Sequence, residues 1–551
     1  MILRVLKLAQ QDVFIRKASG LTRVIGPWTA LAYGFMNPGI LYAFLYLIWT
    51  MQLYPGVYMP LASIVGVGLM FFPALLYIWM SIAMPRSGGE YIWGSRTLSP
   101  QWGLVAGWGL TLVGLAWSGG CTYWAVSWGF NMALRALAVS AAGSAYATHP
   151  LWHISDVLDT GLGSVAVGTI LIISWMGIMY RGAKAAMMLS WIGVFAGTIG
   201  MLAFDLGVFT GGGVPYFISQ FNALSGTTYD AVLTAAKTAN WPIGVYSIPV
   251  SLTGGITYVA LNTLGTTYTA NIMGEVKQVQ KAAIIAMLGA PILFMIYWTS
   301  FYWIAYYGFT GEFWAAASYF APGGSGFGTW AGWPFGNVMP MPTFMLVFLN
   351  PNVAYSVIAS LGFAVTTYAS CMGMAFGPIR NLFAYSFDRL LPTYFARTSR
   401  RGSPWAAMIL GIVLAEFFLI WTVYSPYAYT VSATTILAWF FSWAIVGVIG
   451  MAFPYTKRGK AILEKSPELV KKKVGGLPIV FIWGLATFIV SVAIDYYMLL
   501  PAFQGLATTT YIWITIIMFI APPFVIYPLS RVYHKRKHVA MELQFKEIPP
   551  D

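Results

Sequence analysis

Charged residues are scarce in this chain, and their scarcity decides its class. Asp, Glu, Lys and Arg make up 8% of its 551 residues, against about a quarter in an ordinary soluble domain. Between Arg23 and Arg86 there is no charged residue, and this gap is long enough for two membrane crossings of roughly 20 residues each. We therefore expect a lipid bilayer to be the main solvent of the protein.

Cysteine is also rare, because the sequence has only Cys121 and Cys371. Both lie within apolar runs, which argues against a disulfide framework and against a thiolate metal site. The sequence has no nucleophile elbow, phosphate-binding loop or zinc signature in the required context. We expect no cofactor, no bound metal and no enzymatic activity.

One pattern offers an enzyme as an alternative. His149 and His153 are spaced i, i+4 near Asp156 and Asp159, and on a helix this arrangement could hold a metal ion. Pro150 and the position in a connection between apolar segments weaken that interpretation.

The charge that is present is mainly positive, with a net value of +14. Nucleic acid is not the expected partner, because the cations lie beside apolar segments, where anionic lipid headgroups account for them. Apart from Arg135 and Lys237, the Lys and Arg residues occupy alternate connections and the two tails. By the positive-inside rule, this pattern predicts a multi-pass protein of the cell membrane with both termini in the cytoplasm.

The apolar segments predict an all-α integral membrane fold with about twelve crossings. Their approximate ranges are 26–50, 58–84, 100–137, 162–180, 185–209, 245–273, 283–309, 351–386, 405–425, 430–454, 477–501 and 509–530. The expected divisions are a cytoplasmic segment 1–23, a first set of five crossings in 24–209, an external loop 210–244, a second set in 245–454 that includes the external loop 310–350, a cytoplasmic loop 455–476, two final crossings in 477–530 and a cytoplasmic tail 531–551. The two long external loops are interpreted either as lids or as plain connections.

Proline and glycine interrupt the first crossing of each set. Pro38 and Gly39 lie at mid-depth in the first, where they remove a backbone donor and weaken the helix. The sixth contains Gly254, Gly255 and Gly265. Interrupted helices at matching positions of two halves are typical of inverted-repeat transporters, whereas a single proline kink or packing glycine would have no such meaning.

Several connections carry specific motifs. They read PRSGGEY at Pro85–Tyr91, RGAK at Arg181–Lys184, GEV at Gly274–Val276, and RNLFAYSFDRLLP at Arg380–Pro392, followed by RTSRRGSPWAA. Over about Ser19 to Phe524 the chain resembles the amino acid-polyamine-organocation (APC) superfamily of amino acid permeases. The resemblance implies a leucine-transporter-type fold, with ten core helices in two inverted repeats and two peripheral helices. It also implies secondary amino acid transport by alternating access.

An interrupted helix can also be interpreted without the family. One half exposes N–H groups at its start and the other exposes C=O groups at its end, which suits a zwitterionic amino acid. We place the substrate carboxylate on the backbone and the ammonium near carbonyls, in a predicted site made of Asn37, Pro38, Gly39, Ile40, Leu261, Asn262, Thr263 and Gly265. No acidic residue adjoins either interruption, which gives no support for a di-cationic substrate.

Two sets of residues are candidates for coupling to an ion. Thr366, Thr367 and Ser370 offer the uncharged oxygens that Na⁺ prefers and face the first helix by resemblance; hydroxyls bonded to their own helix are the alternative. Glu416 lies mid-way along the ninth crossing and is the candidate for H⁺. A carboxylate bonded to a neighbouring helix is the alternative there.

A third set lies on the predicted cytoplasmic side. Arg86, Glu90, Glu275 and Asp388, together with Arg96 and Arg389, are candidates for an inner gate. Solvation of helix ends explains the cations equally well, whereas the three acids among cations favour pairing.

Other functions remain open at this stage. A carrier of another organic amine or of a polyamine, a transporter-like nutrient receptor and a channel would all be compatible with interrupted helices. Saturable flux distinguishes a carrier from a receptor, which binds without flux.

Overall fold

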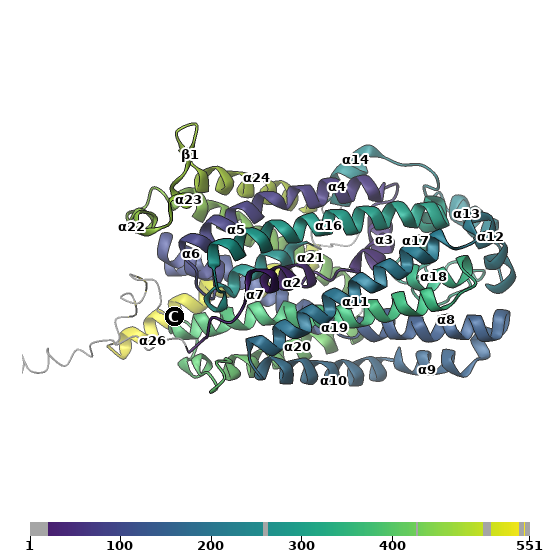
Figure 1. Ribbon diagram of the computed structural model, residues 1–551, viewed down its shortest axis with the longest axis horizontal. Helices are drawn as coiled ribbons and strands as arrows, with labels where there is room; N and C mark the ends of the chain where they lie inside the picture. Colours follow the sequence, from purple (N-terminus) through teal and green to yellow (C-terminus); the bar gives the residue numbers. More distant parts are fainter. Residues whose placement is uncertain are drawn as a thin grey trace, which may run out of the picture.

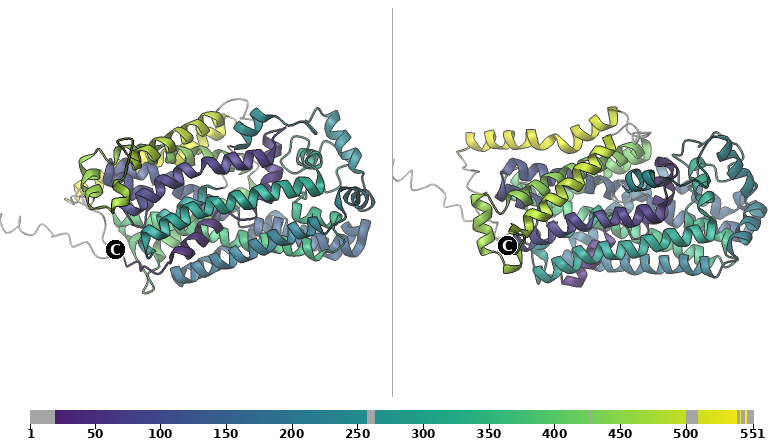
Figure 2. Two further views of the ribbon diagram at one scale, coloured as in Figure 1. Left: turned by 45° about the horizontal axis from the view of Figure 1, so that its top comes forward. Right: turned by 90° about the horizontal axis from the view of Figure 1, so that it is seen from above.

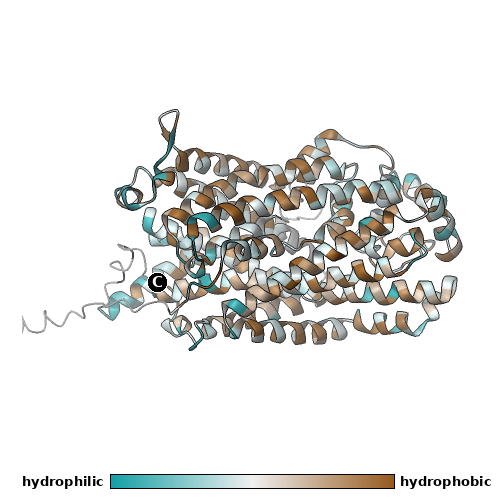
Figure 3. Ribbon diagram, in the orientation of Figure 1, coloured by the Kyte–Doolittle hydropathy of each residue, from teal (hydrophilic) through white to brown (hydrophobic). Residues whose placement is uncertain are grey.

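The computed structural model describes residues 20–256, 263–425, 428–499 and 509–538, together with Met541 and Phe545. Long helices run side by side along the longest axis of the molecule (Figure 1). The two further views show that they form one bundle (Figure 2). Brown, apolar residues follow the lengths of the helices in Figure 3, and teal, polar residues are prominent around α22 and the connection at β1.

The helices of the first half are α2 (Pro27–Met36), α3 (Tyr42–Leu53), α4 (Met59–Leu69), α5 (Phe71–Ala83), α6 (Gly89–Thr97), α7 (Pro100–Gly120), α8 (Asn131–Ala142), α9 (Pro150–Leu158), α10 (Gly161–Tyr180), α11 (Ala183–Phe209), α12 (Gly213–Leu224) and α13 (Tyr229–Thr238). Those of the second half are α14 (Ile248–Val250), α16 (Val279–Phe309), α17 (Gly311–Phe320), α18 (Pro342–Leu349), α19 (Ala354–Phe387), α20 (Trp405–Tyr424), α21 (Ala428–Ala452), α22 (Lys457–Lys465), α23 (Glu468–Lys471), α24 (Ile479–Leu499), α25 (Thr509–Thr515) and α26 (Pro522–Arg536).

Shorter elements connect or interrupt these helices. The π-helical turns are η1 (Ala125–Phe130), η3 (Ser251–Gly255) and η8 (Ile516–Ile520). The 3₁₀ turns are η2 (Gly143–Thr148), η4 (Leu264–Asn271), η5 (Met273–Glu275) and η6 (Thr393–Ala396). One small antiparallel hairpin pairs β1 (Lys473–Val474) with β2 (Leu477–Pro478).

The prediction of a helical, multi-pass membrane protein is confirmed. Among the described residues nine helices are long and apolar enough to cross a membrane, or up to ten if the bent pair Pro100–Gly120 and Ala125–Thr148 forms one crossing. This pair falls on the predicted third crossing, which bends by 48°. The count of twelve and the inverted repeat stay predictions.

The two long connections predicted to be external both contain helices. The range 210–244 includes α12 and α13, and the range 310–350 includes α17 and α18. α17 packs on α3 as well as on α13. Both connections therefore contain helices that pack on the bundle, whereas the sequence did not predict helices in them.

Two buried helices lie at the centre of the fold. Every residue of α3 from Tyr42 to Gln52 is buried, as expected of a helix that is apolar on all sides and enclosed by others. α19 packs against both α7 and α11, and its part from Ala369 to Ser386 is entirely buried.

The start of the first helix is joined to the segment around η5. The N–H groups of Val24 and Ile25 donate to the carbonyl of Glu275 at 2.9 and 3.0 Å, and Lys277 N–H donates to the Ile25 carbonyl at 2.8 Å. Ile25 and Val276 form a parallel bridge. These bonds tie the beginning of α2 to the end of the segment that follows η4.

Candidate functional site

The backbone between α2 and α3 departs from helical form at the predicted position. α2 ends at Met36 and α3 begins at Tyr42. Pro38 supplies no N–H donor to a helix, and Gly39 adopts a φ of +82° that side chains disfavour. A Cβ on Gly39 would lie 2.5 Å from the ring of Tyr42, so glycine is required there by both conformation and space.

The second interrupted segment is described in part. η3 ends at Gly255 and η4 begins at Leu264, whereas Leu261 and Asn262, both predicted to contact substrate, lie outside the described residues. Thr263 is buried. Its carbonyl accepts from the Thr266 N–H at 3.2 Å and from the Thr266 hydroxyl at 2.9 Å, so this predicted ammonium ligand already has partners.

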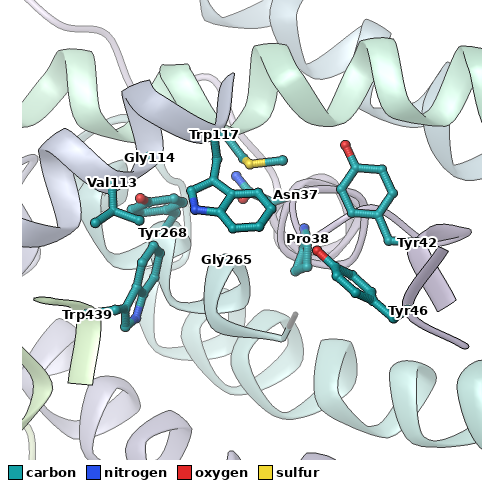
Figure 4. A pocket seen from close by; sticks show the side chains of 11 residues that line it. Asn37, Pro38, Tyr42, Tyr46, Val113, Gly114, Trp117, Gly265, Tyr268 and Trp439 are labelled. Atoms are coloured by element: carbon teal, nitrogen blue, oxygen red, sulfur yellow. The ribbon is translucent and has the colours of Figure 1, made fainter. Parts of the chain in front are cut away.

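A cavity lies between these two segments, and it brings together the predicted residues Asn37, Pro38 and Gly265 (Figure 4). Its volume is about 40 Å³. The other lining residues, from α3, α7, η4, α19 and α21, are Tyr42, Tyr46, Val113, Gly114, Trp117, Tyr268, Met374 and Trp439. Five of these eight residues carry aromatic rings, and none of the described lining residues carries a formal charge.

Asn37 supplies the main unsatisfied polar group of this cavity. The side chain is fully buried, and neither its amide nitrogen nor its amide oxygen has a hydrogen-bond partner in the described part of the chain. Burying such a group without partners costs about 1–3 kcal/mol per unmade bond. Since Asn37 lines the cavity, it offers both a donor and an acceptor to an occupant.

The backbone donors expected near Asn37 are largely in use. Asn37 N–H donates to the Tyr33 carbonyl and Gly39 N–H to the Met36 carbonyl, each at 3.0 Å. Because proline has no N–H, Ile40 is the remaining donor of the four predicted positions. The sequence placed the substrate on the backbone of this segment, whereas in the structure it is the side chain of Asn37 that lines the cavity.

The predicted hydroxyl cluster lies directly behind Asn37. Ser370 donates its hydroxyl to the Asn37 carbonyl at 2.6 Å. Thr366 and Thr367 are buried, and among the described residues their hydroxyls have no partner. A Cβ added to Gly197 of α11 would lie 3.1 Å from the Thr366 hydroxyl oxygen, so three helices converge at this point.

Glu416 lies elsewhere, on α20. Its Oε2 accepts a hydrogen bond from the Thr169 hydroxyl of α10 at 3.0 Å. This is the contact with a neighbouring helix that the sequence left open as the alternative to an ion-coupling role.

Comparison with known families identifies the chain. A family model for amino acid permeases matches residues 25–522, which is nearly the whole sequence. The protein belongs to the amino acid permease family. The resemblance to APC superfamily permeases is thus confirmed, and the match points to a transporter rather than an enzyme. No curated protein matches the sequence significantly.

A few charged groups of the permease, at the opposite end from α12 and α13, form a buried cluster. Gly88 and Gly89 have φ values of +105° and +36°, which let α6 begin against η4. Gly88 N–H donates to the Asn271 carbonyl at 3.1 Å. The carboxylate of Glu90, which follows Gly89, accepts a hydrogen bond from the Asn271 side chain at 2.7 Å.

Two buried ion pairs complete this cluster. Arg96 contacts Asp388 at 2.6 Å, and Tyr91 donates its hydroxyl to the same carboxylate at 2.7 Å. Glu275 pairs with Arg380 at 2.7 Å, with both side chains at most 2% exposed. The pairing of acids with cations was expected, but Arg380 was not among the predicted gate residues.

The remaining two predicted gate cations lie beside these pairs. Arg86 is partly buried and donates to the Pro85 carbonyl at 3.1 Å. The backbone carbonyl of Arg389 accepts from the Ser530 hydroxyl at 2.8 Å, so the corner after α19 is fastened to α26. We name the group of Glu90, Arg96, Glu275, Arg380 and Asp388 the inner cluster.

Burial changes the acidity of Glu90. The carboxyl group is fully buried. It is carried by α6, a helix that is not among the nine candidate membrane spans. Desolvation raises its pKa from 4.5 to about 7, although the hydrogen bond from Asn271 opposes this shift. Loss of water disfavours the charged form of a carboxyl group, so Glu90 titrates near neutral pH.

Proposed function

We propose that this permease is a secondary active transporter of amino acids that works by alternating access. The substrate is held in the cavity between the link from α2 to α3 and η4. The observation that carries the proposal is the Asn37 amide, which is buried and lines the cavity with both polar atoms unsatisfied among the described residues. A substrate that supplies an acceptor and a donor to Asn37 removes the free-energy cost of burying this amide without hydrogen-bond partners.

The lining favours a substrate without net charge. An amino acid gives its carboxylate to the Asn37 N–H₂ group and its ammonium to the Asn37 oxygen, while the rings of Tyr42, Tyr46 and Tyr268 face the rest. Aromatic faces attract an ammonium group. A polyamine would bring unpaired charges into a cavity whose described lining has no acid, and burying such charges is costly. We therefore favour a neutral amino acid.

The test is uptake of a mixed pool of labelled amino acids into proteoliposomes, with empty liposomes as the control. Saturable accumulation that is lost in Asn37→Ala supports the proposal. Binding of an amino acid without flux would instead favour a nutrient receptor. Absence of both binding and uptake for every amino acid would move the assignment to a carrier of another organic amine or polyamine.

We further propose that Na⁺ binds beside the substrate at Thr366, Thr367 and Ser370. The support is the pair of buried threonine hydroxyls without described partners, next to the Asn37 carbonyl that Ser370 contacts. Thr366→Val keeps the shape and removes one oxygen ligand. We expect it to raise the Na⁺ concentration for half-maximal uptake about tenfold. Uptake that is unchanged when choline replaces Na⁺ would rule out the site.

For Glu416 the hydrogen bond to Thr169 favours a structural role. We expect Glu416→Gln to keep that contact, because glutamine also has an acceptor oxygen. Uptake driven by a pH gradient should then stay within about twofold of the wild type, at equal expression. Abolished uptake would instead identify Glu416 as the H⁺-coupling group.

We propose that the inner cluster is the cytoplasmic gate and that its pairs separate when the central cavity opens inward. The cluster joins α6, η4, η5 and α19 through buried contacts. The Coulomb attraction within such a pair is strong while water is excluded, and it weakens once water enters and raises the local dielectric constant.

The titration of Glu90 predicts how pH acts on this gate. In the closed cluster its pKa is about 7, and hydration on opening returns it towards 4.5. Below pH 4.5 Glu90 is protonated in both the closed and the open cluster. Between pH 4.5 and 7 it loses its proton in the open cluster first, which favours opening. Above pH 7 it is ionised in both, and the free energy of opening has become more favourable by about 3 kcal/mol than at low pH. Where inward opening limits turnover, uptake accelerates as internal pH rises from about 5 to about 7.

Rates of uptake into proteoliposomes of different internal pH check this prediction. Glu90→Gln stays neutral throughout and should give a flat profile, while Glu464→Gln on the exposed face of α22 should keep the wild-type slope. Identical profiles for the wild type and Glu90→Gln would show that another group controls the gate.

A further inference from the structure

A second cavity lies at the end of the bundle away from the inner cluster. Its volume is about 760 Å³, within the usual range of ligand pockets. We name it the outer cavity. Its walls come from the segment 123–128 that includes the start of η1, from α8, η2 and α9, and from the residues 334–339. They include Tyr123, Trp128, Arg135, Trp152, Asp156 and Asp159. The scarcity of cations at this end predicts that it faces the outside.

The charges of the outer cavity are arranged around one buried guanidinium. Arg135 Nη2 contacts Asp159 at 2.7 Å and Asp156 at 3.1 Å. The Arg135 side chain is only 3% exposed, whereas 50% of the Asp156 side chain is exposed. One cation thus faces two carboxylates, which leaves the lining with a net charge of −1.

Two further observations point to an occupant. Arg135 Nε is buried and has no hydrogen-bond partner in the described ranges, although Arg135 lines the cavity. The walls are rich in aromatic rings, and the guanidinium already lies 5.3 Å from the ring centre of Trp152. The cavity therefore presents an exposed acid, a buried unpaired donor and aromatic faces.

The lining also separates the possible ligand classes. An anion would meet a net negative charge, and the guanidinium nitrogen Nη2 is already shared by the two carboxylates. A metal ion is not favoured, because among the described residues no group of three His, Cys, Asp or Glu side chains could hold one. An organic ammonium ion satisfies Asp156 and the aromatic faces together.

A column of aromatic rings joins the two cavities. Trp128 of the outer cavity lies 4.8 Å from Trp124, measured between ring centres. Trp124 in turn lies 5.7 Å from Tyr42 of the central cavity and 5.2 Å from Trp49. A ligand in the outer cavity is thus separated from the central cavity by Trp49 and Trp124.

We propose that the outer cavity is a binding site for organic ammonium ions, with the ammonium on Asp156, an adjacent acceptor oxygen on Arg135 Nε and the hydrocarbon part against Tyr123 and Trp128. The ammonium belongs either to the transported amino acid or to an amine that is not transported. The first case rests on the proposed function, and the second does not.

The test uses L-phenylalaninamide, which carries an ammonium and a neutral carbonyl, with purified full-length permease in isothermal titration calorimetry. We expect binding in the wild type and in Gly265→Ala, whose extra methyl obstructs the central cavity. Asp156→Asn should weaken it about fivefold, as a half-exposed ion pair allows. Asp230→Asn, on the exposed start of α13, is the matched control and should bind as the wild type does.

The variant Asp156→Asn is suited to this test because Arg135 keeps Asp159 at 2.7 Å and stays paired. N-acetyl-L-phenylalanine, which is an anion, should bind at least about tenfold more weakly than the amide. Equal affinity of the wild type and Asp156→Asn for the amide, or of the wild type for both probes, would overturn the proposal.

Uptake of labelled phenylalanine by Asp156→Asn then identifies the source of the ammonium. A raised KM at unchanged kcat shows that the amino acid passes through the outer cavity. Unchanged uptake together with weakened amide binding shows a separate amine site. If no amino acid is transported but amide binding still depends on Asp156, the proposed function fails and the outer site stands.

Discussion

Gly265→Ala is expected to abolish amino acid uptake by this permease. A methyl group at this position would clash with the Asn37 amide oxygen and lie 3.2 Å from Pro38 Cγ. The amide must then turn or move, and it is the group that we propose for holding the substrate. Because overpacking costs about 1–3 kcal/mol, binding should weaken by up to about a hundredfold.

The matched control is Gly177→Ala in α10. It adds the same methyl group at a helical glycine outside the central cavity, where a Cβ has no heavy atom within 4 Å. Both variants are compared by uptake into proteoliposomes and by thermal stability. Wild-type uptake in Gly265→Ala would show that the substrate binds outside the central cavity. Uptake lost in both variants would show that the change acts through folding.

Glu275→Gln is expected to weaken the closed form of the inner cluster. It leaves the Arg380 guanidinium buried without the carboxylate that it contacts at 2.7 Å. Removing one partner of a buried pair costs about 3–5 kcal/mol. If the cluster gates the cytoplasmic side, this cost falls on the closed form alone. We expect kcat to change about tenfold or more and KM to change much less.

The double variant Glu275→Gln with Arg380→Met separates gating from folding. Methionine packs where the guanidinium now lies on the ring of Phe376 and removes the unpaired charge. Thermal stability should return in the double variant, since two neutral partners leave no buried charge, while the altered kcat remains. Glu464→Gln is the control for loss of an exposed acid. Equal changes of kcat and KM in Glu275→Gln would contradict the gating role.

The sequence predicted a membrane protein because a long stretch without charged residues is stable mainly inside a bilayer. It also predicted that the first helix is interrupted around Pro38 and Gly39, since both residues act locally on the backbone. The Asn37 side chain was less accessible to prediction. Its burial without a partner depends on residues from distant parts of the chain that surround it.

The aromatic lining could not be predicted from sequence. Trp117 and Trp439 lie in apolar spans in which most residues are large and uncharged, so composition does not show which side chains face a cavity. The partner of Glu275 was missed for a similar reason. Arg380 lies within a recognised motif, but its pairing depends on how α19 is rotated against η5, and this rotation follows from packing of the whole bundle.

The backbone bonds between Val24, Ile25 and the residues Glu275 to Lys277 have a mechanical consequence. They fasten the starting half of the first interrupted helix to the end of the second interrupted segment, so the two cannot tilt independently. On the proposed mechanism, a displacement of the Asn37 link would move the segment that carries Glu275, the partner of Arg380. Substrate binding in the central cavity and opening of the inner cluster would then be coupled through this one segment.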